Sequence, residues 1–257
     1  STQGVSSAAS DVYKRQSEAR NIEPTLQTDC YGGFYTPSDA TGDIHKFTSG
    51  LARACERLGV TFVQDADIEQ ISREGRPYAM DVLREGGTVR EQHETDAIVI
   101  CAGAVSRKFA RQMGDSLNIY PVKGYSISVH LDDAQSQAAA PSVSLLDEAA
   151  KIVTSRLGDR FRVAGTAEFN GFNMDIRAER VQPLVDWTRK HFPGIRTSRV
   201  VPWCGLRPMT PNMMPRVGPG KRPGVFYNTG HGHLGWTLSA ATAQMLAASV
   251  GKTLPTV

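Results

Sequence analysis

The stretch VFYNTGHGHLGWTLSAATAQML, residues 225–246, is the part of the sequence that decides the fold class. Its β-branched and aromatic run at 225–229 predicts a strand, and the Ala- and Leu-rich residues 234–250 predict a helix. Between them, residues 230–235 read GHGHLG and match the pattern G-x-G-x-x-G. A glycine-rich turn that follows a strand and opens a helix is typical of an α/β fold with a ligand at the turn.

The physical properties of this turn favour a ligand. Glycines let the backbone approach a ligand closely, and the free N–H groups at a helix start favour an anion or an electron-rich ring edge. A complete dinucleotide fingerprint also requires a second strand and an acidic residue about 20 positions further on. Only 22 residues follow Gly235, and none is Asp or Glu. The turn is therefore not a complete nucleotide-binding βαβ unit, and a plain strand-to-helix turn is the alternative.

Metal binding is disfavoured at this turn. His231 and His233 are two residues apart, which on a strand would put both imidazoles on one face. Glycines flank them, however, and no carboxylate or cysteine is near in the sequence, so we expect no metal. The four cysteines have no metal-ligand spacing and indicate reduced thiols in a cytoplasmic protein; they are Cys30, Cys55, Cys101 and Cys204.

The remaining chain predicts a mixture of helices and strands. Residues 97–101 (AIVIC) form a continuous apolar run, as a strand of a parallel sheet does, and run into Ala102 and Gly103. A helix is expected at 43–58, with Asp43 as its cap and one apolar face. A second helix is expected at 177–191. Further strands are expected at 60–63, 68–72, 79–84, 88–92, 120–131, 142–146, 150–155, 161–167 and 199–206.

Composition limits the classes of function. The chain has 257 residues, enough for one large domain or two small ones, and a net charge of +3, too low for a nucleic-acid binder. Residues 151–224 hold 14 basic and five acidic side chains, which suits an anionic membrane surface or, more simply, a solvated face. No apolar run approaches the roughly 20 residues of a membrane-spanning helix. Residues 1–16 are small and polar, lack the apolar core of a secretory signal, and predict either a disordered lead or sequence foreign to the domain.

Two motifs carry a resemblance to a known family. GLRPMTPN at 205–212 and NTGHGHLGWTL at 228–238 resemble the D-amino-acid oxidase-like FAD-dependent oxidoreductases, specifically the carboxyl-terminal two-thirds of D-amino-acid dehydrogenase small subunits. The resemblance spans about residues 19–254. The family's opening βαβ unit, which carries its own G-x-G-x-x-G, has no counterpart before Asp43. Close relatives read Cys-Gly-Ser-Gly where this chain has SAAT at 239–242. Further matches are EPTL at 23–26, TGD at 41–43, YPVKGYS at 120–126 and LDE at 146–148.

The resemblance implies an α/β (α+β) fold in two interleaved parts. Residues 17–104 and 205–257 would form a partial FAD-binding Rossmann-like domain, and residues 105–204 an antiparallel-rich substrate-binding domain. It implies oxidative deamination of D-amino acids by hydride transfer from Cα to flavin N5, with electrons passed to a quinone at the inner face of the plasma membrane. Two alternatives stay open: a glycine- or sarcosine-type amine oxidase on the same fold, and an inactive fragment without the unit that binds the ADP half of FAD.

The resemblance also implies roles for single residues. Arg207 matches the arginine that clamps the substrate carboxylate, for which a planar guanidinium is well suited. His233 would border the substrate, and no side-chain base is obligatory. The residues alone also allow a structural arginine, solvated histidines, a core isoleucine and a strand-ending turn. The expected FAD contacts are Ile68, Ala102, Gly103, Gly230, His231, Gly232, His233, Leu234, Gly235, Trp236 and Thr237.

Overall fold

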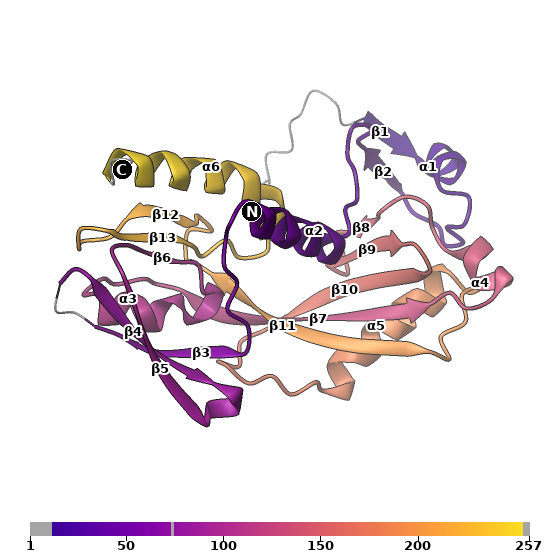
Figure 1. Ribbon diagram of the computed structural model, residues 1–257. Helices are drawn as coiled ribbons and strands as arrows, with labels where there is room; N and C mark the ends of the chain where they lie inside the picture. Colours follow the sequence, from indigo (N-terminus) through magenta and orange to yellow (C-terminus); the bar gives the residue numbers. More distant parts are fainter. Residues whose placement is uncertain (1–11, 73–74, 254–257) are drawn as a thin grey trace. The chain divides into compact units, whose positions relative to one another are not determined.

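The computed structural model describes residues 12–72 and 75–253 (Figure 1). These residues divide into two compact units. Unit 1 contains the described residues up to Phe47, together with Lys123–Glu168 and Asn173–Gly205. Unit 2 contains Thr48–Val122, Phe169–Phe172 and the described residues from Leu206 onward. The predicted functional division into an FAD-binding and a substrate-binding domain stays a prediction.

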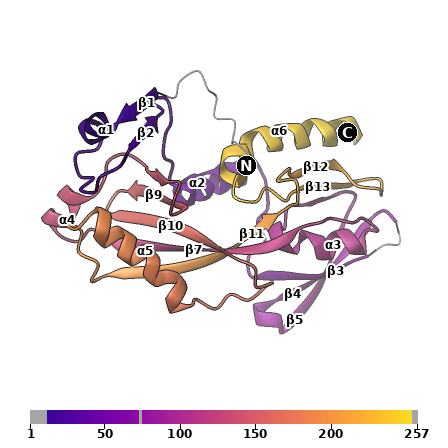
Figure 2. The same ribbon diagram turned by 180° about the vertical axis from the view of Figure 1, so that it is seen from behind.

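Unit 1 is built on a five-stranded sheet of order β11-β7-β10-β9-β8. Its strands are β7 (Tyr120–His130), β8 (Leu146–Asp147), β9 (Ile152–Leu157), β10 (Arg160–Glu168) and β11 (Val200–Met209). β10 pairs antiparallel with both β7 and β9, and the positive φ of Gly158 (66°) allows the tight β9–β10 turn. Helix α5 (Ala178–His191) lies along one face of the sheet, as Figure 2 shows. Leu184, Val185 and Trp187 of α5 join Phe161 and Val163 of β10 in a buried core.

The start of unit 1 corrects one prediction. The predicted disordered lead covers residues 1–16, of which 1–11 lie outside the described residues. Residues 12–15 are not disordered: they form β1 (Val12–Arg15), which pairs antiparallel with β2 (Gly32–Tyr35). α1 (Gln16–Ile22) follows directly. The polar composition concealed this strand because its backbone hydrogen bonds come from a partner about 20 residues away. A short helix, α4 (Ala134–Ala139), was also not predicted.

Unit 2 contains two three-stranded sheets. One has the order β12-β13-β6, from β6 (Ile98–Ile100), β12 (Arg216–Pro219) and β13 (Val225–Thr229). The other is an antiparallel set of β3 (Ala66–Ile71), β4 (Tyr78–Arg84) and β5 (Val89–Thr95), in which η1 (Glu85–Gly87) joins β4 to β5. The helices are α2 (Ile44–Arg57), which begins in unit 1, η2 (Gly103–Val105), α3 (Ser106–Gln112) and α6 (Gly235–Thr253).

The first sheet of unit 2 agrees with the sequence in its most specific feature. β6 pairs parallel with β13, with Ile98 opposite Val225 and Ile100 opposite Tyr227, so the apolar AIVIC run was interpreted correctly. Helix α6 packs against β12 and β13. The Tyr227 hydroxyl donates to Asp115 Oδ2 at 2.9 Å, and burial together with this acidic partner raises the pKa of Tyr227.

Some element predictions were wrong. Residues 60–63 form no strand, and the strand expected at 142–146 is reduced to the two residues of β8. Asp43 does cap α2, since its Oδ1 accepts from the backbone N–H of His45 at 3.1 Å and of Lys46 at 3.2 Å. The apolar face of α2 nevertheless stays half exposed among the described residues: Phe47 and Leu51 are each 50% exposed, and Leu58, which follows the helix, is 85% exposed. An amphipathic pattern predicts the helix but not what covers it.

Candidate functional site

The candidate site lies at one edge of the β12-β13-β6 sheet. Because β6 and β13 run parallel, their carboxyl ends meet at the same edge. Ala102 and Gly103 follow β6, and Gly230 follows β13. Thr229 joins the two turns: its hydroxyl donates to the Gly103 carbonyl at 3.2 Å and lies 2.8 Å from the Ser106 hydroxyl. The structure therefore brings together two predicted cofactor segments that are more than 120 residues apart in the sequence.

The glycine turn is held by the strand that carries the other family motif. The backbone N–H of Gly232 donates to the Pro208 carbonyl at 3.0 Å. Gly230 (φ +80°) and Gly232 (φ +57°) both have the left-handed conformation that favours glycine. A Cβ on Gly232 would lie 2.8 Å from Met209 Sδ. The motifs at 205–212 and 228–238 therefore meet, and packing against β11 is a sufficient physical reason for glycine at 232.

The two histidines of the turn have different environments. His231 Nε2 lies 3.1 Å from the Thr242 hydroxyl of α6, and burial lowers the pKa of His231, which favours the neutral imidazole. This contact ties the turn to α6. His233 is exposed, as are Leu234 and Trp236 at 36% and 41%. His231 therefore has a described structural partner, and the side chains of His233, Leu234 and Trp236 are each partly exposed to solvent.

Arg207 lies on β11, one residue before the carbonyl that holds Gly232. Side chains alternate along a strand, so Arg207 shares a face with Met209, whose sulfur lies against the glycine turn. Arg207 is partly buried, and burial alone lowers the pKa of its guanidinium, which remains charged at neutral pH. A partly buried cation on the face that meets the turn is suited to binding a carboxylate.

Asn228 was not among the site residues predicted from the sequence. Its Oδ1 is buried and has no hydrogen-bond partner among the described atoms. Its backbone N–H donates to the Cys101 thiol, and this donor by itself lowers the pKa of the thiol. Burial has the larger effect and raises that pKa. A buried acceptor without a partner implies a donor that the described residues do not supply. Asn228 opens the motif NTGHGHLG, so its place at the start of the motif was the available signal.

Comparison with known proteins identifies the family. The family model described as "FAD dependent oxidoreductase" (DAO) matches residues 4–249. The chain belongs to this family. It is 59% identical to D-amino acid dehydrogenase 3 of Mesorhizobium japonicum over 240 residues, which are 93% of this chain and 58% of the relative. It is 40% identical to D-amino acid dehydrogenase of Dechloromonas aromatica over 238 residues, 91% of this chain and 56% of the relative.

The solved structures confirm the fold class of this DAO-family chain. Glycine oxidase from Geobacillus kaustophilus superposes with a TM-score of 0.81 at 24% identity, over 95% of this chain and 64% of that protein. The predicted mixture of helices and largely antiparallel sheets of the FAD-dependent oxidoreductases is therefore correct. The chain spans somewhat more than half the length of the curated relatives it matches, on the carboxyl-terminal part of the Mesorhizobium protein.

Ile68, another predicted FAD contact, lies on a different sheet from the two turns that follow β6 and β13. It lies on β3, is 39% exposed and pairs with Val82 of β4. Within the described residues, one link from this sheet to the site passes through α3, and Ile71 and Tyr78 also share a buried core with Ile98 and Ile100 of β6. The Ile71 backbone N–H donates to the Gln112 side chain at 3.1 Å, and α3 follows Gly103. A role for Ile68 stays a prediction.

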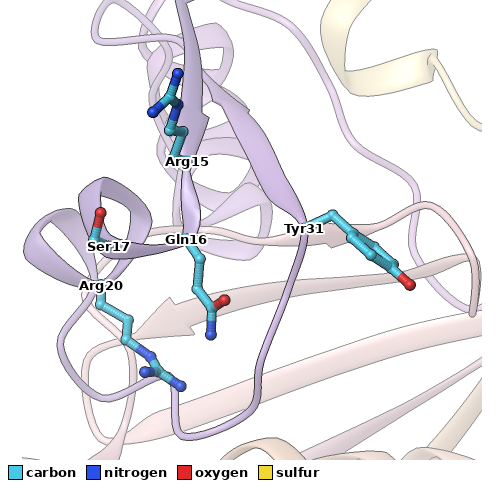
Figure 3. A pocket seen from close by; sticks show the side chains of 5 residues that line it. All are labelled: Arg15, Gln16, Ser17, Arg20 and Tyr31. Atoms are coloured by element: carbon cyan, nitrogen blue, oxygen red, sulfur yellow. The ribbon is translucent and has the colours of Figure 1, made fainter.

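Other kinds of site receive little support. Among residues 12–72 and 75–253, no group of three or more His, Cys, Asp or Glu side chains is arranged to hold a metal ion. No helix in the same ranges is long and apolar enough to cross a bilayer. A pocket in unit 1 contains none of the predicted site residues, and Figure 3 shows the side chains that line it: Arg15, Gln16, Ser17, Arg20 and Tyr31.

Proposed function

We propose that this chain is part of an FAD-dependent oxidoreductase that oxidises D-amino acids. The observation that carries the proposal is the convergence, within unit 2, of the turn at 102–103, the glycine turn at 230–235 and the strand that bears Arg207. The curated relatives named D-amino acid dehydrogenase support the choice of substrate class.

The residues present fit FAD. The buried Asn228 Oδ1 needs a donor, which the N–H and hydroxyl groups of a flavin cofactor can provide. The first turn of α6 contributes backbone N–H groups and the positive end of a helix dipole, which would stabilise negative charge on a flavin. We assign the cofactor to Gly103, the glycine turn, Asn228 and the first turn of α6. When bound, FAD supplies the acceptor for the hydride from the substrate Cα.

Arg207 is the proposed substrate anchor. Two parallel hydrogen bonds from a guanidinium to a carboxylate fix both position and orientation, and such positioning contributes several kcal/mol to a rate. The other finer assignments are a quinone as electron acceptor and peripheral contact of the basic segment at 151–224 with an anionic membrane. An oxidase of glycine or secondary amines on the same fold would release peroxide. A dehydrogenase would instead reduce an added dye that takes the place of the quinone acceptor.

One experiment tests the cofactor site on this chain directly. Cys101 is exposed and touches Asn228, so bound FAD should protect its thiol from iodoacetamide. Labelling is followed by mass spectrometry with and without FAD, and Cys30 in unit 1 serves as the internal control. We expect slower labelling of Cys101 alone. Equal labelling of Cys101 at saturating FAD would contradict the assignment.

Two variants separate cofactor binding from substrate binding. Gly232→Val should abolish FAD protection of Cys101, because a β-branched side chain cannot adopt φ +57° beside Met209 without moving the turn. Arg207→Ala should leave FAD protection unchanged and lower kcat/KM for D-alanine about 100-fold or more, since it removes a bidentate contact to the substrate. Loss of FAD protection in Arg207→Ala would show that this arginine serves the cofactor.

A second candidate is that this length of chain does not hold FAD by itself. The observation in its favour is the exposed apolar face of α2 among the described residues, where Phe47 and Leu51 are each 50% exposed. Large exposed apolar surfaces are typical of sites that another segment or protein covers. A purified chain without flavin absorbance, and without Cys101 protection at millimolar FAD, would support this candidate over the first.

A further inference from the structure

Helix α3 has an unfavourable arrangement of charges. Its seven residues include Arg107, Lys108 and Arg111 and no acidic side chain. Arg107 and Lys108 lie in the first turn, where the positive end of the helix dipole disfavours cations. Arg107 and Arg111 are four residues apart, a spacing at which like charges repel each other on a helix. The sequence places these cations where the helix itself opposes them, which indicates that negative charge from outside the chain offsets the cost.

The cations cover the outer side of α3. The buried residues of this helix are Ser106, Phe109 and Ala110, and the latter two belong to the core of unit 2. The three cations, by contrast, are exposed. Lys108 Nζ lies 5.3 Å from the centre of the Phe109 ring. Within the part of the chain that the structure describes, neither Lys108 nor Arg107 forms an ion pair with a carboxylate.

A second group of cations lies beside the end of α3. The turn between β12 and β13 carries Lys221 and Arg222. Lys221 Nζ donates to the Gly114 carbonyl at 3.3 Å, and Arg222 Nε donates to the Met113 carbonyl at 3.1 Å. Figures 1 and 2 both show α3 and this turn at the same end of unit 2. The cations of the helix and of the turn therefore form one surface.

Few carboxylates belong to the segments that form this surface. Residues 105–122 and 216–224 together hold six basic side chains and one acidic side chain. The acidic one is Asp115, whose Oδ2 accepts from the Tyr227 hydroxyl at 2.9 Å and from the Lys221 backbone N–H at 3.1 Å. Its carboxylate is therefore already engaged inside unit 2, and a large excess of positive charge remains at the surface.

The neighbouring strands add one more cation and no free carboxylate that the contacts reveal. Arg76 Nε donates to the Pro223 carbonyl at 3.3 Å. Glu69, whose carbonyl accepts from the Gln112 side chain at 3.3 Å, pairs with Arg90 at 2.8 Å. We call the whole surface the α3 basic face; its members, of which only Arg222 is partly buried, are Arg76, Arg107, Lys108, Arg111, Lys221 and Arg222.

We propose that the α3 basic face docks on the surface of an anionic phospholipid bilayer. Clusters of about four to eight Lys and Arg side chains are typical of surfaces that bind anionic lipid headgroups. Val105, directly before α3, is 42% exposed and gives the face an apolar edge that can enter the headgroup region. A nucleic acid would also attract cations, but the net charge of the chain is only +3.

The α3 basic face narrows the membrane contact to one part of the protein. Within the basic segment at 151–224, only the turn between β12 and β13 takes part. Because η2 joins Gly103 to α3, the docked bilayer would lie close to the proposed cofactor turn at 102–103. The use of this contact, access to a membrane-borne electron acceptor, rests on the proposed function. Docking itself needs neither FAD nor turnover.

Vesicle co-sedimentation of the 257-residue chain without FAD tests the partner. The probes are vesicles of equal parts phosphatidylglycerol and phosphatidylcholine, and vesicles of phosphatidylcholine alone. We expect binding to the anionic vesicles, at least about tenfold weaker binding to the neutral ones, and release of the chain as the salt rises from about 0.05 M to about 0.5 M. Equal binding to both kinds of vesicle, or no binding to the anionic ones, would overturn the proposal.

Two competitors separate a bilayer from other sources of negative charge. Inorganic phosphate should release no more chain from anionic vesicles than sodium chloride of the same ionic strength does. A larger release by phosphate would replace the bilayer with a site for the free anion. A short DNA duplex, at the same concentration of phosphate groups as the lipid, should leave most of the chain on the vesicles. Transfer of the chain to the DNA would identify a nucleic acid as the partner and refute the proposal.

A double variant locates the surface. Arg107→Gln combined with Lys108→Gln should weaken binding to anionic vesicles at least about tenfold, since each cation near an anionic membrane contributes roughly fivefold. The matched control is Arg189→Gln combined with Lys190→Gln, which removes an exposed Arg-Lys pair from the last turn of α5. The control has the same net charge and should change binding less than about twofold. An equal loss in both double variants would show that overall charge, and not the α3 basic face, attracts the vesicles.

The melting temperature of the free chain distinguishes an external partner from an internal one. Removal of Arg107 and Lys108 relieves their repulsion by the helix dipole, so the double variant should melt at the same temperature or higher. A lowered melting temperature with unchanged vesicle binding would show that these cations are paired within the protein and would contradict the proposal. FAD protection of Cys101 is measured separately from vesicle binding, so failure of the docking surface and failure of the proposed function are distinguishable.

Discussion

The glycine turn of unit 2 and a polar cluster in unit 1 are both held in place by hydrogen bonds, but of different kinds. In the turn, backbone conformation dominates: Gly232 has φ +57° and donates its N–H to the Pro208 carbonyl. In the cluster, buried charges dominate. Lys123 and Glu168 have side chains only 0% and 6% exposed, with Nζ and Oε1 3.5 Å apart.

Further contacts complete the cluster. Lys123 Nζ donates to Asn173 Oδ1 at 3.1 Å and to the Asp175 carbonyl at 3.0 Å. The Tyr125 hydroxyl donates to Glu168 Oε2 at 2.7 Å, and Arg177 approaches Glu168 Oε1 at 3.2 Å. The comparison teaches that a turn can be recognised from its glycines, whereas a buried ion pair consists of residues that look ordinary in the sequence. The two regions should also respond differently to substitution.

The largest effect is expected in the cluster. Lys123→Met leaves Glu168 buried with one cation fewer, and breaking a buried pair on one side is strongly destabilising. We expect the melting temperature to fall by roughly 5–10 °C in differential scanning calorimetry. Lys151→Met is the control, because the Lys151–Glu148 pair is 74% and 71% exposed and should contribute little. Equal melting temperatures for the two variants would mean that the cluster is not held by charge.

A smaller effect is expected in the turn. Gly232→Ala combines a left-handed φ with a Cβ 2.8 Å from Met209 Sδ, and should cost roughly 2–3 kcal/mol in urea unfolding. Gly86→Ala isolates the cost of the left-handed backbone, because Gly86 has φ +65° and an added Cβ there would have nothing within 4 Å. Adding Met209→Ala should restore part of the stability lost in Gly232→Ala and none of that lost in Gly86→Ala. If both alanine variants are equally destabilised, packing against β11 does not constrain the turn.

The buried carboxylate of Glu23 in unit 1 should make the stability of the fold depend on pH. It is 3% exposed; burial opposes its ionisation, but donors from Thr25, Ser142 and Val143 outweigh this and lower its pKa below the ordinary 4.5. The carboxylate therefore stabilises the fold above about pH 4.5, and this stability is lost as the pH falls through the lowered value.

Glu23→Gln should accordingly be less stable than the unmodified chain at pH 7 by roughly 1–2 kcal/mol, and the difference should shrink between pH 4.5 and pH 3. Urea unfolding at several pH values measures it. In the control Glu148→Gln, which loses only an exposed contact to Lys151, the loss of stability at pH 7 should be smaller. A difference that grows on acidification would contradict the lowered pKa of Glu23.

The smallest effect is expected at the hydroxyl that joins the two turns. Thr229→Val keeps the shape of a residue that is 2% exposed but removes the bonds to the Gly103 carbonyl and the Ser106 hydroxyl. We expect a loss of about 1 kcal/mol in urea unfolding. Thr88→Val is the control: it removes an exposed hydrogen bond from the Thr88 hydroxyl to the Glu85 carbonyl, so the free energy of unfolding should fall by less. No difference between the two would mean that the turns are coupled by other contacts.

Much of the fold could be predicted from local sequence. The helices at 43–58, 177–191 and 234–250, the parallel strand at 97–101 and the neighbouring strands at 150–155 and 161–167 all depend on periodicity, caps and turn residues within a few positions of one another. The candidate site was predictable only in part. The glycine turn and Arg207 stood out through their motifs, whereas Asn228 did not, because an unpaired atom becomes visible only when its surroundings are known.

By itself, the sequence determined the family, most of the helices and strands, and a glycine turn that only small residues can form. Tertiary structure decided which of these meet. It joined Gly103 to Thr229 across more than 120 residues, tied Gly232 to Pro208, left Leu51 of α2 half exposed and placed Arg162 over Trp203. The physical reason is that periodicity and glycine φ angles are properties of neighbouring residues, whereas burial and charge pairing depend on residues that only the folded chain brings together.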